Sequence, residues 1–364
     1  MFLFLDFIIG KKLMEFKHIS HFQDTSSGKS FGLMPDNKEI LSFELSNKNG
    51  MRVTVINYGA TVTSLHVPAA EGKLVDVVLG FDSLPSYLES YKLPSVPYFG
   101  TTVGRYAGRI NKGLFILNDT TYQLSTNNNG NALHGGNTGF GEKVWNVVNL
   151  TSGDNPSITL SLLSENLEEN YPGELHVELT YTLTEENELQ LDYKARSTED
   201  TIINLTHHSY FNLDGHDDTV LNQTMIIDAC TILETNEVSI PTGNFTDLEN
   251  HKFDFRKAKN CPEAIDSSFV INAANNVAAQ LYSSKNNLKM SVYTNQPSVH
   301  IYVGGNCFDI LKGKENTAYH KTSGICFETQ NFPDAPNQQH FPNSVLKKGE
   351  EYLQKTVYKF ENIN

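Results

Sequence analysis

Three segments of the chain, residues 99–110, 204–213 and 327–337, combine acidic, basic and hydroxyl side chains at high density. A carboxylate and an imidazole can move protons at neutral pH, because one can act as a base while the other acts as an acid. The third segment supplies Glu328, and the second supplies His207 and His208. Each of these side chains, taken alone, could equally have a structural role, so the segments must be judged together.

Several short motifs that suggest a cofactor, a metal or a nucleophile do not have the context they require. Residues 28–32 read Gly-Lys-Ser-Phe-Gly, but Pro35 and a strand-like run follow where a nucleophile elbow needs a helix. Gln23 stands where a phosphate-binding loop needs its first glycine. The glycine-rich residues 135–141 lack the order of a dinucleotide site, and no cysteine pair has CxxC spacing. The sequence predicts no cofactor and no metal.

The elements that must position these residues are mainly strands. Apolar residues alternate with polar ones over residues 174–183, a turn follows at 184–187, and the alternation resumes over 189–193. Residues 51–56, 157–162 and 288–293 show the same period of two. Only residues 84–88 and 273–281 suggest short helices. The pattern predicts an all-β fold, a large antiparallel β-sandwich with few short helices.

Composition and charge describe a globular chain with an acidic surface. Of 364 residues, 39% are hydrophobic and 19% are charged, with a formal net charge of −14. Such a surface disfavours nucleic acid and anionic membranes, which bind clustered lysine and arginine. We expect one domain over residues 31–364, preceded by an extension over residues 1–30.

The first ten residues are apolar but lack the basic leader of a secretory signal. N-x-[ST] sequons at Asn118, Asn149, Asn222 and Asn244 leave secretion open, but an asparagine-rich chain contains such sequons by chance. The sequence therefore predicts a cytoplasmic protein, and we expect a monomer or a weak homodimer.

The three segments together resemble the aldose 1-epimerase (galactose mutarotase) family. The resemblance runs from about Lys38 to Phe360 and is carried above all by Asn-Leu-Thr-x-His-Ser-Tyr-Phe-Asn-Leu and Glu-Thr-Gln-Asn-Phe-Pro-Asp-Ala. It implies a galactose mutarotase-type β-sandwich and an isomerase that interconverts the α and β anomers of free aldoses such as galactose and glucose. By motif match, Glu328 resembles the family's catalytic base and His208 its catalytic acid. The resemblance implies that the sugar, the expected small-molecule partner, is bound by Arg109, His134, Ser209, Tyr210, Asp266 and Gln296.

Two positions depart from the family pattern. The second motif reads Thr206-His207-His208 where the family often has Thr-Asn-His, so the acid is assigned to His208 by register with Ser209. His207 adds a titratable neighbour that could shift the working pH. Gly108 stands before Arg109 where the family often has asparagine, which removes one possible sugar contact.

The expected chemistry needs one acid and one base. Opening the hemiacetal removes the O1 proton while the ring oxygen O5 gains one, and rotation about C1–C2 followed by reclosure gives the other anomer. We expect ionised Glu328 to take the proton from O1 and protonated His208 to donate to O5, with each positioned proton transfer contributing about 10²- to 10⁴-fold.

Three alternatives remain at this stage. A non-catalytic carbohydrate-binding protein of the same fold would not need the acid and base. A hexose-6-phosphate 1-epimerase would need more basic residues than Arg105 and Arg109 supply. A glycosidase could use Glu328 and Asp266 as its two carboxylates.

Overall fold

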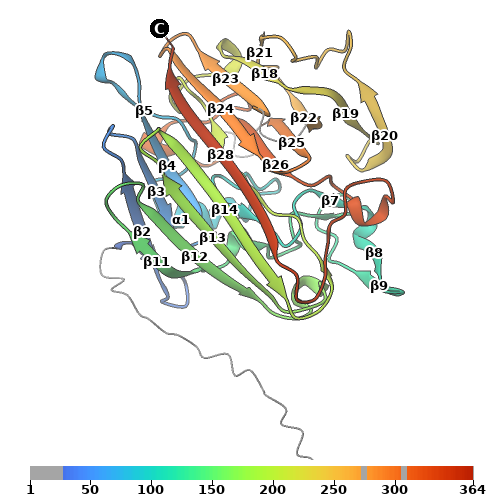
Figure 1. Cartoon of the computed structure of the whole chain (residues 1–364). Helices are drawn as coiled ribbons and strands as arrows, with labels where there is room; N and C mark the ends of the chain where they lie inside the picture. The colour runs from blue at the N-terminus through green and yellow to red at the C-terminus, as the bar shows by residue number, and fades with distance from the viewer. Residues whose placement is uncertain (1–27, 272–276, 305–309, 364) are drawn as a thin grey trace, which may run out of the picture.

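A computed structural model describes residues 28–271, 277–304 and 310–363, whose regular secondary structure is mainly antiparallel strand (Figure 1). Within these residues the one α-helix is α1, Leu84–Ser90, and no helix is long and apolar enough to cross a membrane. The remaining helical segments are single 3-10 turns. They are η1 (Ala70–Gly72), η2 (Asn111–Gly113), η3 (Phe140–Glu142), η4 (Glu168–Asn170), η5 (Val220–Asn222), η6 (Lys314–Asn316) and η7 (Ala335–Asn337).

The largest sheet has nine strands, and its long strands lie side by side in Figure 1. Its apolar residues alternate with polar ones, so that one face is buried, as the period of two requires. In spatial order its strands are β11 (Asn146–Thr151), β12 (Ser157–Ser164), β13 (Leu175–Leu183), β14 (Glu188–Ser197), β28 (Tyr352–Asn362), β24 (Leu288–Thr294), β23 (Ala279–Ser283), β18 (Thr224–Ile227) and β21 (Lys259–Asn260).

Two further sheets cover the buried face of the nine-stranded sheet. The six-stranded sheet contains β17 (Tyr210–Phe211), β26 (Ile325–Gln330), β25 (Ser298–Val303), β22 (Ile265–Ile271), β19 (Ala229–Thr235) and β20 (Pro241–Asp247). The five-stranded sheet contains β1 (Lys29–Leu33), β2 (Glu39–Ser46), β3 (Arg52–Ile56), β4 (Thr61–Pro68) and β5 (Leu74–Asp76).

The remaining strands form four short two-stranded ribbons. They are β6 (Thr102–Val103) with β16 (Thr206–His207), β7 (Arg109–Ile110) with β10 (Ala132–Leu133), β8 (Leu114–Leu117) with β9 (Thr120–Gln123), and β15 (Thr201–Ile202) with β27 (Val345–Leu346).

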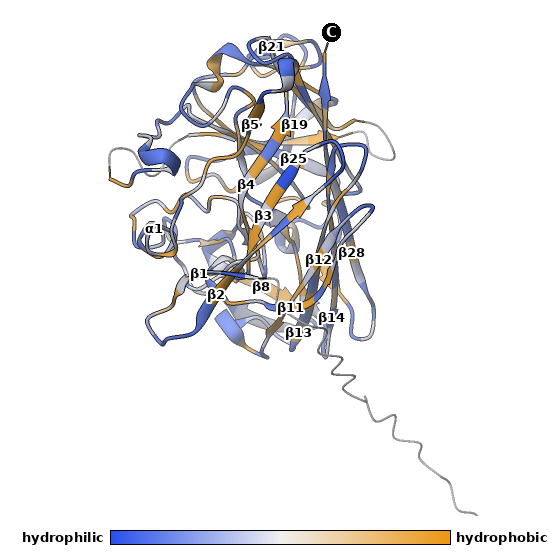
Figure 2. Cartoon of the chain, turned by 90° about the vertical axis from the view of Figure 1, so that its left-hand side faces the viewer, coloured by the Kyte–Doolittle hydropathy of each residue, from blue (hydrophilic) through white to orange (hydrophobic). Residues whose placement is uncertain are grey.

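One hydrophobic cluster draws side chains from all three large sheets, including Val53, Leu179 and Phe327, each fully buried. In Figure 2 the apolar segments lie mainly along the strands. A domain is defined by a shared core, so the described strands of the three sheets pack as one unit, while the single domain over residues 31–364 stays a prediction. Strand β1 begins at Lys29, so the last residues of the predicted extension belong to the sheet, while residues 1–27 lie outside the described residues.

The predicted strands are confirmed, and so is one of the two short helices. The hairpin over residues 174–193 is β13–β14, with Leu183 opposite Leu189 and a turn between them. The predicted helix over residues 84–88 is α1. Of the predicted helix over residues 273–281, residues 273–276 lie outside the described residues, and the described part is wrong, because residues from Ala279 form strand β23 and pair with β24.

Arg105 ties the loop between β6 and β7 to the connection between β12 and β13. Its guanidinium is buried and donates from Nη1 to the carbonyls of Pro172 and Gly173 at 3.0 and 2.8 Å. Nη2 donates to the carbonyl and the hydroxyl of Ser164 at 3.1 and 2.6 Å. Burial lowers the pKa of Arg105 to about 10, so the group remains charged at neutral pH. The loop that leads to Arg109 is thus anchored to the connection between β12 and β13.

Replacing Arg105 with methionine is expected to lower the free energy of unfolding by about 3 kcal/mol, because several buried carbonyls lose a charged donor. Urea unfolding followed by circular dichroism measures this change. The matched control is Arg196→Met, which removes a mostly exposed guanidinium paired with Glu351 and should change stability far less. Equal losses in the two variants would show that the Arg105 contacts do not stabilise the fold.

Candidate active site

A cleft of about 310 Å³ opens between the six-stranded sheet, the β7–β10 ribbon and the loop over residues 93–98. Most of the side chains that line it are polar. The lining residues include Tyr98, Gly108, Arg109, Asn128, His134, Glu142, His208, Asp266, Ser268, His300 and Glu328.

The six-stranded sheet contributes one row of polar side chains to the cleft. Ser268 on β22 pairs with His300 on β25, and His300 pairs with Glu328 on β26. Side chains in register across neighbouring strands point to the same face, and so does a residue two positions along a strand. Asp266 lies two positions before Ser268, so this face presents two carboxylates, an imidazole and a hydroxyl.

The β7–β10 ribbon adds a guanidinium and a second imidazole. Leu133 pairs with Arg109, and the backbone N–H of the next residue, His134, donates to the carbonyl of Gly108 at 3.2 Å. Arg109 Nε donates to Asn128 Oδ1 at 3.1 Å, while Nη1 lies 3.9 Å from Asp266 Oδ2. The pairing therefore holds Arg109 and His134 beside each other, with Arg109 facing the carboxylate of Asp266.

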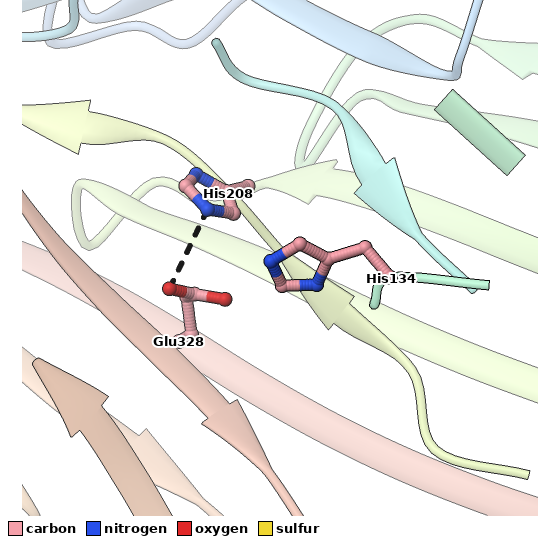
Figure 3. A group of neighbouring side chains, drawn as sticks. All are labelled: His134, His208 and Glu328. Atoms are coloured by element: carbon pink, nitrogen blue, oxygen red, sulfur yellow. Dashed lines mark ion pairs between the residues drawn. The ribbon is translucent and has the colours of Figure 1, made fainter. Parts of the chain in front are cut away.

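His208 and Glu328 face each other in the cleft as an acid–base pair. His208 Nε2 lies 3.6 Å from Glu328 Oε1, and the two side chains are only 6% and 3% exposed. One ring nitrogen of His134 completes a group whose atoms lie within 4.8 Å of one another (Figure 3). The rings of Tyr98 and Tyr210 lie 5.7 and 5.3 Å from the His208 ring, measured between centroids, and hold it in place.

The structure separates the two adjacent histidines. His208 lines the cleft, whereas His207 lies in strand β16 with its ring between Tyr181 and Tyr358. His207 Nε2 lies 2.7 Å from the hydroxyl of Ser209. Burial, together with the nearby His208, lowers the pKa of His207 to about 3. The ring of His207 therefore stays neutral near neutral pH, which argues against a shift of the working pH by this residue.

Burial and neighbouring charges determine the protonation states of His134 and Asp266 in the cleft. Burial, then the positive charges of His208, Arg109 and His300, hold the pKa of His134 well below its usual range. Because the N–H of Gly108 donates to Nδ1 of His134 at 3.3 Å, the proton of the neutral ring belongs on Nε2. Burial raises the pKa of Asp266, but His300 and Arg109 outweigh it and lower that pKa to about 2.

Three predicted sugar-binding residues do not line the cleft. Ser209 contacts His207 instead, and the ring of Tyr210 lies behind His208 and packs against Phe99. Gln296 is buried in the turn between β24 and β25, where its Nε2 donates to Asn295 Oδ1 at 3.0 Å. The assignments of Ser209, Tyr210 and Gln296 as direct contacts are therefore corrected.

The sequence reasoning missed His300, which lies in the centre of the polar row. The signal was available, because Val299, Ile301 and Val303 alternate as apolar residues and leave His300 on the opposite face. Tyr98 was also missed, although it directly precedes the first of the three dense segments.

The backbone conformation at position 108 explains why this residue is glycine. Its backbone lies in the left-handed region, at φ +79°, and a Cβ there would come within 3.0 Å of Cβ and Cγ of Pro333. Any side chain at this position would be strained and would press on the wall of the cleft. The space beside Arg109 is therefore left open to a ligand.

Several motif residues hold the three segments together and do not face the cleft. The amide of Asn204 donates to the carbonyls of Ala107 and Asn331, at 2.9 and 3.1 Å. The hydroxyl of Tyr106 donates to the carbonyl of Phe332 at 3.0 Å. The motifs thus combine residues for chemistry with residues that position them.

This arrangement can transfer protons to and from two oxygens of one small polar molecule. Two histidines and a carboxylate can also hold a metal ion, but the same atoms are those that an acid–base reaction needs free. No stretch of the described residues carries a nucleotide-binding motif.

Comparisons with known proteins agree with this chemistry. The family model described as aldose 1-epimerase matches residues 42–359. Galactose mutarotase from Bos taurus is 40% identical over 85% of this chain and 91% of its own length, and aldose 1-epimerase from Escherichia coli is 30% identical over 90% and 97%.

Solved structures agree as well. An aldose epimerase homologue from C. elegans has a TM-score of 0.82 at 30% identity and covers 89% of this chain and 99% of its own. Galactose 1-epimerase from Lactobacillus acidophilus has a TM-score of 0.80 at 28% identity, over 93% and 98%. With its β-sandwich, its cleft and these relatives, the chain belongs to the aldose 1-epimerase family and is an isomerase that interconverts the anomers of aldoses.

Proposed function

We propose that Glu328 is the base and His208 the acid with which this chain opens and recloses a free aldose. The observation that supports this proposal is the 3.6 Å separation of His208 Nε2 and Glu328 Oε1 at the wall of the cleft. O1 and O5 of a cyclic aldose are bonded to the same carbon, so an acid and a base that act on them must lie this close to each other. General acid–base catalysis requires such positioning before any matching of pKa values.

The reaction then proceeds in two symmetrical halves. Glu328 takes the proton from O1 while His208 donates one to O5, so the C1–O5 bond breaks and C1 becomes an aldehyde. Rotation about C1–C2 presents the opposite face of the carbonyl. O5 attacks that face and returns its proton to His208, while O1 recovers a proton from Glu328. Protons and electrons balance, and the side chains end in their starting states.

The remaining charged groups of the cleft suit the hydroxyls of the sugar. Neutral His134, protonated on Nε2, can donate to O5 or to a neighbouring hydroxyl. Arg109 supplies N–H donors and ionised Asp266 supplies acceptors, 3.9 Å apart. Donors and acceptors placed on both sides of a polar ligand fix its orientation.

We further propose that galactose and glucose are substrates. The mammalian relatives are named galactose mutarotases, which supports galactose. Arg109 is the only lysine or arginine among the described residues that line the cleft, which argues against a phosphorylated hexose. The acid–base pair argues against a protein that only binds sugar.

A substrate panel tests this proposal. Optical rotation of freshly dissolved α-D-galactose and α-D-glucose should relax faster with the protein, whereas glucose 6-phosphate should show a much smaller acceleration and nitrophenyl galactoside should release no nitrophenol. Acceleration confined to the phosphorylated sugar would contradict the assignment. No acceleration of any sugar, with galactose bound in calorimetry, would instead indicate a binding protein.

A further inference from the structure

Both ring nitrogens of His300 are already occupied by protein groups. Nδ1 lies 2.8 Å from the hydroxyl of Ser268, and Nε2 lies 2.8 Å from Asp266 Oδ1. The side chain is 16% exposed, so it has little freedom to turn toward a ligand. His300 therefore lines the cleft without a free nitrogen for a sugar hydroxyl, and any influence on the sugar must pass through Asp266.

The charges around His300 come from four elements. Asp266 on β22 and Glu328 on β26 are negative, Arg109 on β7 is positive, and His134 after β10 is neutral. Burial lowers the pKa of His300, but the hydrogen bond and charge of Asp266, with the charge of Glu328, outweigh it and raise that pKa above its ordinary value. His300 is thus more readily protonated than an unperturbed histidine.

We propose that His300 is a positioning residue, whose imidazolium fixes the carboxylate of Asp266 for sugar binding and makes the affinity for the sugar fall as the pH rises. The inference rests on the proposed role of Asp266 as a sugar ligand. With Oδ1 bound to His300, Oδ2 of Asp266 faces Arg109 and is the oxygen left to accept a sugar hydroxyl.

The direction of the pH effect follows from the protonation of His300. The imidazolium can donate from both nitrogens at once, to Ser268 and to Asp266. After deprotonation Nε2–H can still donate to Asp266, while the Ser268 hydroxyl turns and donates to Nδ1. The hydrogen bond survives but loses its charge, and charge-assisted bonds are roughly twice as strong as neutral ones. Asp266 itself stays ionised throughout, because its pKa is about 2.

Steady-state kinetics with galactose test the proposal, from about pH 5.5 to about pH 9, a window that brackets the ordinary histidine pKa of about 6.5. In the wild type, KM should rise about three- to tenfold across this window, on the scale of one charge-assisted hydrogen bond. His300→Gln keeps one donor for Asp266 but no charge, so its KM should be raised at acid pH and nearly independent of pH. His300→Ala should raise KM further, and kcat should change little in either variant.

Asp266→Asn separates this inference from the proposed function. It should raise KM and also abolish the pH dependence of KM, because no carboxylate remains for His300 to hold. If Asp266→Asn leaves KM unchanged, Asp266 is not a sugar ligand and the inference falls with that proposal. If Asp266→Asn raises KM while His300→Gln keeps the wild-type KM and its pH dependence, the role of His300 alone is overturned. A loss confined to kcat in His300→Gln would also overturn it.

Discussion

Replacing Glu328 with glutamine is expected to lower kcat by about 10²- to 10⁴-fold, the usual contribution of a positioned proton transfer. The amide keeps the shape of the carboxylate but cannot accept the proton of O1, whereas the other groups of the cleft still bind the sugar. KM should therefore change little. Polarimetry of α-D-galactose at several concentrations measures both constants.

Glu142 provides the matched control. It lines the same cleft, and burial raises its pKa to about 7, which would suit a base at neutral pH. Glu328, in contrast, lies 3.6 Å from His208, the proposed acid. Glu142→Gln should thus retain most of kcat. If Glu142→Gln were crippled and Glu328→Gln active, the base would be Glu142.

The second large effect concerns the two adjacent histidines. His208→Asn is expected to lower kcat by about 10²- to 10⁴-fold, because the asparagine amide cannot supply a proton to O5. His207→Asn should leave kcat within a few-fold of the wild type. It should instead lower the free energy of unfolding by about 1–3 kcal/mol, because its ring is packed between two tyrosines and contacts Ser209.

Kinetics and thermal unfolding of the two variants, measured side by side, separate these effects. The predicted result is a loss of turnover in one variant and a loss of stability in the other. A severe kcat loss in His207→Asn, at a melting temperature equal to that of the wild type, would show that the acid is His207 and not His208.

Much of the fold could be predicted because half-buried strands repeat every two residues. Residues 175–183 and 189–193 show this repeat, and they form the hairpin β13–β14. The helix predicted around Leu281 is wrong because the short apolar run there fits a helix or a strand equally well. Pairing of Leu281 with Met290 on the neighbouring strand decides the matter, and such long-range pairing is invisible in local sequence.

The candidate site was predicted where motif residues face the cleft and missed where the contact depends on strand register. Glu328, His208, Arg109, His134 and Asp266 all line the cleft, as the resemblance implied. Gln296 was predicted to contact the sugar, but it lies in a turn outside the cleft, four residues before His300. A motif fixes which residues are near one another along the chain, but only the register of β22, β25 and β26 fixes which of them share a face.

In the proposed mechanism one acid and one base act together on the same sugar. Its most direct test is kcat for α-D-galactose in the wild type, Glu328→Gln, His208→Asn and the double variant. Residues that act as a unit are strongly non-additive, so the double variant should lose about as much activity as the worse single variant. Losses that multiply, or a single variant with nearly full activity, would contradict the proposed pair.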